Sequence, residues 1–269
     1  MISKKTLPFA LGLSLLALSN LATPAQAGIT TISVTIENLA PVNSVSFAPL
    51  RLGFGNGTFD SFNIGTTAGP GIVSIAEGGG GAQWFTDFAA ADPTSVRGSV
   101  GGPLLPGMTA TANFVVDSMS VNNRFFTFAN MVIPSNDLFL GNDSPTAFQL
   151  FDASGNLLIT QINQNAAQIW DANSELAIPL NGAFIAGSVN GNRVAENGLV
   201  AFDRSELTAF NGLTTAAGYT FSDAALTNST PVYRITFAAA PEPGTFVFMA
   251  TALGLAAITK RRLRRTERS

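Results

Sequence analysis

Three acidic residues in two short segments have the types and spacing of a cation site. Asp137 follows Asn136 within residues 131–141, where these two polar side chains interrupt an apolar run. Asp171 and Glu175 are four positions apart, so one helical turn or a compact loop would place both carboxylates on one side. Carboxylates are preferred ligands of Ca²⁺, but acids also close turns or are simply solvated. Spacing alone leaves both interpretations open.

The composition lacks residue types that most other catalytic and metal sites require. The chain has no histidine and no cysteine, and its lysines all lie outside residues 28–240. Serine and cysteine nucleophiles paired with histidine, Schiff-base lysines and the usual zinc sites therefore each lack an essential group. Carboxylate chemistry remains.

The first 27 residues have the order of a secretory signal. Lys4 and Lys5 precede an apolar run, and the segment closes on the small residues Ala25 and Ala27, which flank one glutamine. We expect cleavage after Ala27 and export of the rest of the chain, rather than a buried N-terminal helix.

The last 29 residues combine three features. Pro241, Glu242 and Pro243 come first, then sixteen uncharged residues, 244–259, and then a cluster of arginines and one lysine. As a helix the apolar run is about 24 Å long, shorter than the ~30 Å hydrocarbon core, and the basic cluster is expected to stay cytoplasmic. A plain single-pass anchor and a removable sorting tail both fit this pattern.

Trimming both ends leaves an acidic body, residues 28–240, with fifteen acidic residues and six arginines, a formal charge of −9. Such a surface repels nucleic acid and favours divalent cations or basic partners. The length suits one large core.

Short β-branched and aromatic stretches separated by glycine, asparagine and proline predict an all-β body. Residues 29–36, 109–116 and 232–237 have the composition of strands. Residues 69–81 hold a short apolar strand or helix that ends in four glycines; we expect a flexible surface loop there rather than a phosphate-binding loop, because no Gly-Lys-Ser/Thr follows.

The tail, read as P-E-P-G-T, F-V-F-M-A-T-A-L-G-L-A-A-I and T-K-R-R-L-R-R, resembles the PEP-CTERM sorting signals of Gram-negative bacteria. The resemblance implies recognition at Pro241, Glu242 and Pro243 by an exosortase-type processing enzyme. It also implies a transient anchor in the inner membrane before the protein reaches the cell surface or the extracellular space.

The body resembles the spondin N-terminal domain family. The matching stretches are V-T-I-E-N-L-A, I-V-S-I-A-E-G-G, G-P-L-L-P-G-M-T, M-V-I-P-S-N-D-L-F-L-G and I-W-D-A-N-S-E-L. The resemblance implies a two-sheet antiparallel β-sandwich, similar to a C2 domain, between an N-terminal signal helix and a C-terminal hydrophobic helix. It further implies Ca²⁺ held by Asp137, Asp171 and Glu175. Asn173 stands where the family usually has glycine, and asparagine tolerates the left-handed backbone conformation that glycine supplies.

These features together predict a non-enzymatic, calcium-binding adhesion or interaction module outside the cell, with an exopolysaccharide or a surface protein as partner. One alternative is a glycoside hydrolase that uses Asp137 and Asp171. Against it, the body has few aromatic platforms, and Trp170 is expected to pack in the core. A structural envelope protein without a ligand is the other alternative.

Overall fold

The computed structural model describes residues 28–240. The predicted signal residues Ala25 and Ala27 and the sorting residues Pro241, Glu242 and Pro243 lie outside them. No helix of the described body has the length and apolar character needed to cross a bilayer.

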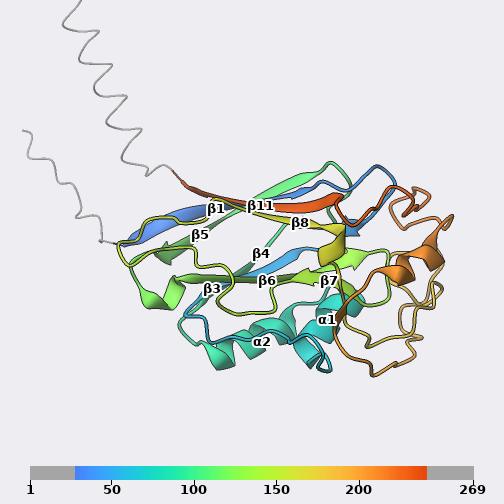
Figure 1. The fold of residues 1–269 in the computed structure, drawn as a ribbon, viewed down its shortest axis with the longest axis horizontal. Coiled ribbons are helices and arrows are strands. Elements are labelled where there is room, and N and C mark those ends of the chain that lie inside the picture. The colour runs from blue at the N-terminus through green and yellow to red at the C-terminus, as the bar shows by residue number, and fades with distance from the viewer. Residues whose placement is uncertain (1–27, 241–269) are drawn as a thin grey trace, which may run out of the picture.

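The body is a two-sheet antiparallel β-sandwich, as the sequence predicts (Figure 1). The smaller sheet contains, in spatial order, β5 (Thr109–Asp117), β1 (Ile29–Asn38), β11 (Pro231–Ala239) and β8 (Gln161–Asn165). The larger sheet contains β10 (Ala201–Phe202), β9 (Trp170–Asp171), β7 (Leu138–Gly141), β6 (Phe125–Ile133), β3 (Leu50–Gly55) and β4 (Val96–Val100), with β2 (Ser46–Phe47) paired to β6. The three strands expected from sequence are β1, β5 and β11.

Strand β1 shows why the smaller sheet forms. Its second half alternates apolar and polar residues, and Ile32, Val34 and Ile36 are fully buried against the larger sheet while the residues between them face outward. The first and last strands are neighbours, with Val34 opposite Phe237. The two ends of the body therefore lie side by side, on the left in Figure 1.

Strand β6 has a different pattern because both of its faces are covered. Phe126 and Phe128 point into the core between the sheets, whereas Ala129 belongs to a second apolar cluster on the opposite face. Two helices, α1 (Pro70–Gly78) and α2 (Ala82–Ala91), cover that opposite face (Figure 1). A strand buried on both faces loses the polar alternation of a half-exposed one.

The two helices correct one expectation. The sequence predicted a short apolar strand or helix ending in four glycines and, for residues 69–81, a flexible surface loop; residues 70–78 instead form the ordered helix α1, whose buried face includes Ile72 and Ile75. The glycines end this helix: Gly79 adopts a left-handed conformation (φ 66°) and its N–H donates to the carbonyl of Ile75. Three short 3₁₀ helices complete the elements: η1 (Val121–Asn123), η2 (Ala166–Gln168) and η3 (Ser205–Phe210).

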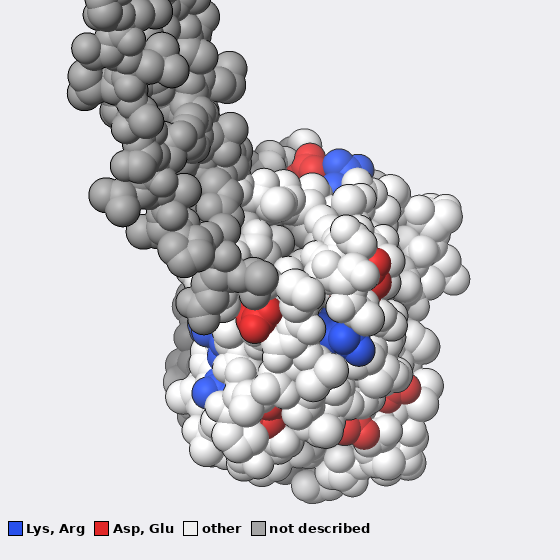
Figure 2. All heavy atoms as spheres, turned by 90° about the vertical axis from the view of Figure 1, so that its left-hand side faces the viewer, with Lys and Arg blue, Asp and Glu red and all other residues white. Residues whose placement is uncertain are grey.

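Charged side chains are sparse on the end of the sandwich from which the two ends of the body emerge. Figure 2 shows that end, with a few acidic and basic side chains scattered among uncharged ones. The predicted cation ligands lie elsewhere, in the connections around β7 and β9.

Candidate metal centre

Strand pairing brings Asp137 and Asp171 together. Strand β7 pairs antiparallel with β9, with Leu138 opposite Asp171, so that Asp137, one residue before β7, lies beside Asp171. The N–H of Ala172 donates to the carbonyl of Asp137 at 3.2 Å and extends this pairing. Two of the three predicted ligands therefore meet at the edge where β7 begins and β9 ends.

Asp137 is 1% exposed. Its Oδ2 accepts from the backbone N–H groups of Ser174 at 2.5 Å and Glu175 at 2.9 Å, and from the Ser174 hydroxyl at 3.1 Å. Its Oδ1 is buried without a hydrogen-bond partner among the described residues. Burial raises the pKa of Asp137, and the hydrogen bonds to Oδ2 oppose that rise.

Asp171 is buried beside this carboxyl. Its Oδ1 accepts from the N–H of Asn173 at 2.7 Å. Burial, and next the charge of Asp137, raise the pKa of Asp171 to about 7. The two carboxyl groups lie close together, and their like charges disfavour ionisation of both at once.

Glu206, on η3, is a third acid at this place that the sequence did not identify. Its Oε1 accepts from the N–H of Asn136 at 3.2 Å. Burial raises the pKa of Glu206 well above its usual value, and the charges of Asp137 and Asp171 raise it further. Nothing in the sequence around Glu206 marks it, because its position depends on where η3 packs.

Glu175, the third predicted ligand, is 2% exposed and its carboxyl faces a neighbouring network. Its Oε1 accepts from the side-chain amide of Asn136 at 3.0 Å. Its Oε2 lies 3.8 Å from Nε of Arg193 and makes no hydrogen bond with the described residues. Burial is the main cause that raises the pKa of Glu175.

Arg193 supplies the positive charge of this network. Its Nη1 lies 2.5 Å from Oε2 of Glu77, a buried residue at the end of α1. The Ser174 hydroxyl lies 2.9 Å from Oε1 of Glu77 and also contacts Asp137, and its single proton can be donated to only one of them at a time. Ser174 therefore joins the Asp137–Asp171 pair to the ion pair between Arg193 and Glu77.

The donor set fits Ca²⁺ in kind. Three buried oxygens around the aspartate pair have no hydrogen-bond partner among the described residues, namely Oδ1 of Asp137, Oδ1 of Asn136 and Oε2 of Glu175. All are hard donors, which Ca²⁺ prefers. Within residues 28–240, however, no three acidic side chains form a preformed metal-ligand group. Coordination would need Glu175 or Glu206 to turn toward the aspartate pair, or carbonyl and water oxygens to complete the shell.

Comparison with models of known protein families finds no match, and comparison with curated proteins finds none either. The resemblances to spondin N-terminal domains and to PEP-CTERM signals stay predictions from the sequence.

Two further expectations concern the surroundings of the acids. Asn173 has φ 48°, so asparagine does hold the left-handed conformation at the position where glycine is usual. Trp170 is 4% exposed and packs against Phe62 and Phe139, which confirms its expected place in the core.

Asp137 and Asp171 contact each other, unlike hydrolase carboxylates, which stand about 5–10 Å apart on either side of a sugar.

Proposed function

We propose that the protein is an exported, non-enzymatic surface or matrix module whose loops are fastened by Ca²⁺ at Asp137 and Asp171. The observation that supports this most directly is the buried contact between these two carboxyls, with the unpartnered Oδ1 of Asp137 beside it. Two adjacent carboxylates repel each other when both are ionised, and a divalent cation removes that repulsion. Asn136, Glu175 and Glu206 surround the pair and supply additional oxygens.

The bound ion would chiefly stabilise the fold. Asp137 lies next to β7, Asp171 ends β9, and Glu206 belongs to η3, so one ion would join three segments that are far apart in the chain. In Figure 1 these elements lie toward the end of the sandwich opposite the two ends of the body. A module attached through its C-terminus would present that end to a partner outside the cell.

A melting experiment tests the metal site. Residues 28–240 contain both sheets and the described core, so this segment serves as the test protein. Ca²⁺ at about 100 times its Kd contributes roughly 2.7 kcal/mol, which raises the Tm of a domain of this size by about 5–10 °C relative to EGTA. Mg²⁺ at the same concentration should do much less, because it demands a tighter octahedral shell.

The matched variants are Asp171→Asn and Asp60→Asn, which change the charge equally. Asp60 is an exposed residue whose carboxylate accepts from the Asn63 amide. The Asp171 variant should lose the calcium response, and the Asp60 variant should keep it. A wild-type melting curve that is identical in Ca²⁺ and EGTA would contradict the metal site.

Export and sorting are tested separately. Mass spectrometry of the surface fraction should find a mature N-terminus at Gly28 and a C-terminus near Pro241 to Pro243, with the arginine-rich end removed. Recovery of an intact Arg265 from that fraction would contradict processing and leave a plain membrane anchor.

A further inference from the structure

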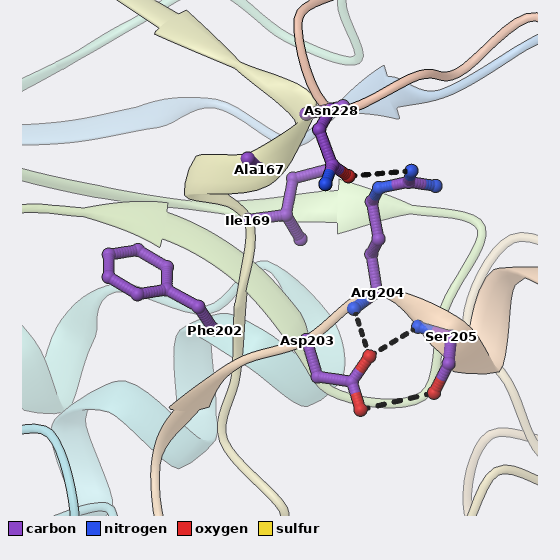
Figure 3. Close-up of a pocket in the computed structure, with 8 residues that line it drawn as sticks. Ala167, Ile169, Phe202, Asp203, Arg204, Ser205 and Asn228 are labelled. Carbon is purple, nitrogen blue, oxygen red and sulfur yellow. Dashed lines mark hydrogen bonds between the residues drawn. The ribbon is translucent and has the colours of Figure 1, made fainter.

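A cavity of about 380 Å³ lies beside the acidic pair and is not used by it. Its walls come from η2 and Ile169, from residues 202–205, which run from the end of β10 to the first residue of η3, and from Asn228 (Figure 3). The volume falls within the range of about 300–1,000 Å³ that is usual for small-molecule sites. Ala167 and Ile169 supply apolar wall, and Phe202, Asp203, Arg204 and Asn228 supply the groups that distinguish one ligand from another.

Phe202 gives the cavity a rigid aromatic wall. Its ring stacks on Trp170 with a centroid distance of 3.6 Å and an interplanar angle of 23°. Trp170 is buried and donates from Nε1 to the carbonyl of Gly141 at 3.1 Å, so it is fixed from behind, while Phe202 is 51% exposed. An exposed ring that is held in one orientation suits the C–H face of a sugar, because little side-chain entropy is lost on contact.

Arg204 gives the cavity a cation with unused donors. Its Nη2 donates to Oδ1 of Asn228 at 3.2 Å, which orients both side chains toward each other (Figure 3). Within residues 28–240, its Nε and Nη1 and the Nδ2 of Asn228 form no hydrogen bond. The ion pairs of the body are formed by Arg193 and Arg234, so the described carboxylates leave Arg204 without one.

Asp203 holds the backbone of Arg204 and forms no ion pair with its guanidinium, although the Arg204 charge is one of the causes that lower the pKa of Asp203. Its Oδ1 accepts from the N–H groups of Arg204 at 2.6 Å and Ser205 at 2.7 Å, and its Oδ2 accepts from the Ser205 hydroxyl at 3.1 Å. These bonds fix the backbone that carries Arg204 and direct the carboxylate toward the turn (Figure 3). A planar guanidinium next to a free amide N–H is well suited to a carboxylate, and an aromatic wall beside it is suited to a pyranose ring.

The body as a whole carries a formal charge of −9, so recognition of an anion here depends on the local cation Arg204. We propose that this cavity binds a uronic acid residue of an acidic polysaccharide. The uronate carboxylate pairs with Arg204 and Asn228, and its ring lies on Phe202. The biological meaning of such a ligand rests on the proposed surface function, but its recognition uses no residue of the acidic pair and needs no Ca²⁺.

The experiment measures binding of short uronate oligosaccharides to residues 28–240 by calorimetry in EGTA. The probes are trisaccharides of galacturonate, glucuronate and mannuronate, each paired with its neutral methyl ester. Chelation excludes calcium bridges between ligand and protein, so a failure here is separate from a failure of the melting experiment. At least one uronate should bind, and about tenfold more tightly than its ester, because hydrogen bonds to charged groups are the stronger kind.

Variants locate the site. Arg204→Gln removes a charged hydrogen bond and Phe202→Ala removes the aromatic wall. Each variant should therefore weaken binding about tenfold or more. Arg234→Gln, on the smaller sheet, removes an arginine from an exposed pair with Glu37 and should leave binding unchanged. Three results would overturn the proposal: no uronate binds at millimolar concentration, the esters bind equally well, or both cavity variants bind like the wild type.

Discussion

Ser174 donates to Oδ2 of Asp137 through its backbone N–H at 2.5 Å, and its hydroxyl lies 3.1 Å from the same oxygen. The N–H of Glu175 adds a third donor. Asp137 therefore organises the turn that follows β9 as well as facing Asp171. One of its oxygens has a structural role, and the other has no hydrogen-bond partner among the described residues.

The structural role of Asp137 predicts a large loss of stability on truncation. In Asp137→Ala two buried N–H groups lose their acceptor, and each costs about 1–3 kcal/mol, so the free energy of unfolding should fall by roughly 2–5 kcal/mol in EGTA. Asp137→Asn keeps an acceptor oxygen and should lose much less. Urea unfolding of both variants measures the difference, and an alanine variant within about 0.5 kcal/mol of the wild type would contradict this role.

The raised pKa of Asp171 predicts how stability depends on pH without metal. Between about pH 4 and pH 7 the folded protein holds a proton that the unfolded chain has released. The unfolded state therefore binds fewer protons, and stability falls as pH rises through this interval and levels off above it. The lowered pKa of Asp203 acts below about pH 4, outside this window.

The measurement is the Tm in EGTA from pH 5 to pH 8. We expect a decline in the wild type and a shallower one in Asp171→Asn, because Glu206 still contributes in the same direction. Saturating Ca²⁺ should reduce the wild-type decline, since the metal binds the ionised carboxylates. A Tm that rises across this range in EGTA, or equal slopes in the two proteins, would contradict the assignment.

Replacing Arg193 should lower the free energy of unfolding far more than replacing Arg234, the other arginine that forms an ion pair. Its partners Glu77 and Glu175 are buried, although Arg193 itself is 38% exposed. Removing it leaves two buried carboxylates without a cation, so Arg193→Gln should cost roughly 1–3 kcal/mol after allowing for solvent screening at its exposed end. Arg234→Gln removes a pair that is exposed on both sides and should cost less than about 1 kcal/mol. Equal costs would contradict this difference.

Much of the fold could be predicted because the strands of the smaller sheet have local sequence patterns that are typical of β-strands. The alternation in β1 and the β-branched composition of β5 and β11 are each visible in the sequence. The sequence predicted α1 only as a short strand or helix and did not indicate α2, because the contacts of both helices are with the far face of the larger sheet. Gly53 illustrates the point: the Phe88 ring of α2 lies where a side chain would begin, a contact that nothing near Gly53 indicates.

The candidate site was predictable in part for the same reason. Asp137, Asp171 and Glu175 were identified from two local motifs, and the pairing of β7 with β9 explains why the aspartates meet. Glu206 and Arg193 come from distant segments with irregular connections, and their places depend on long-range packing. The sequence also gave no sign that the Glu175 carboxyl would face Asn136 and Arg193.

Asn173 tests whether the left-handed turn after Asp171 is required for the site. Its φ is 48°, its side-chain amide donates to the carbonyl of Leu199 at 2.9 Å, and its N–H donates to Asp171. Asn173→Ala should cost about 1–2 kcal/mol for the backbone conformation and should weaken Ca²⁺ binding, whereas Asn173→Gly keeps the conformation and should lose only the amide bond.

Asn43 provides the control for Asn173, because it also has a positive φ, 63°, but lies in the connection before β2. Asn43→Ala should lower the free energy of unfolding by a similar amount and leave the rise in Tm with Ca²⁺ intact. If the two alanine variants lose the calcium response equally, the effect is a general loss of stability. If Asn173→Gly loses as much as Asn173→Ala, the left-handed conformation is not what the site requires.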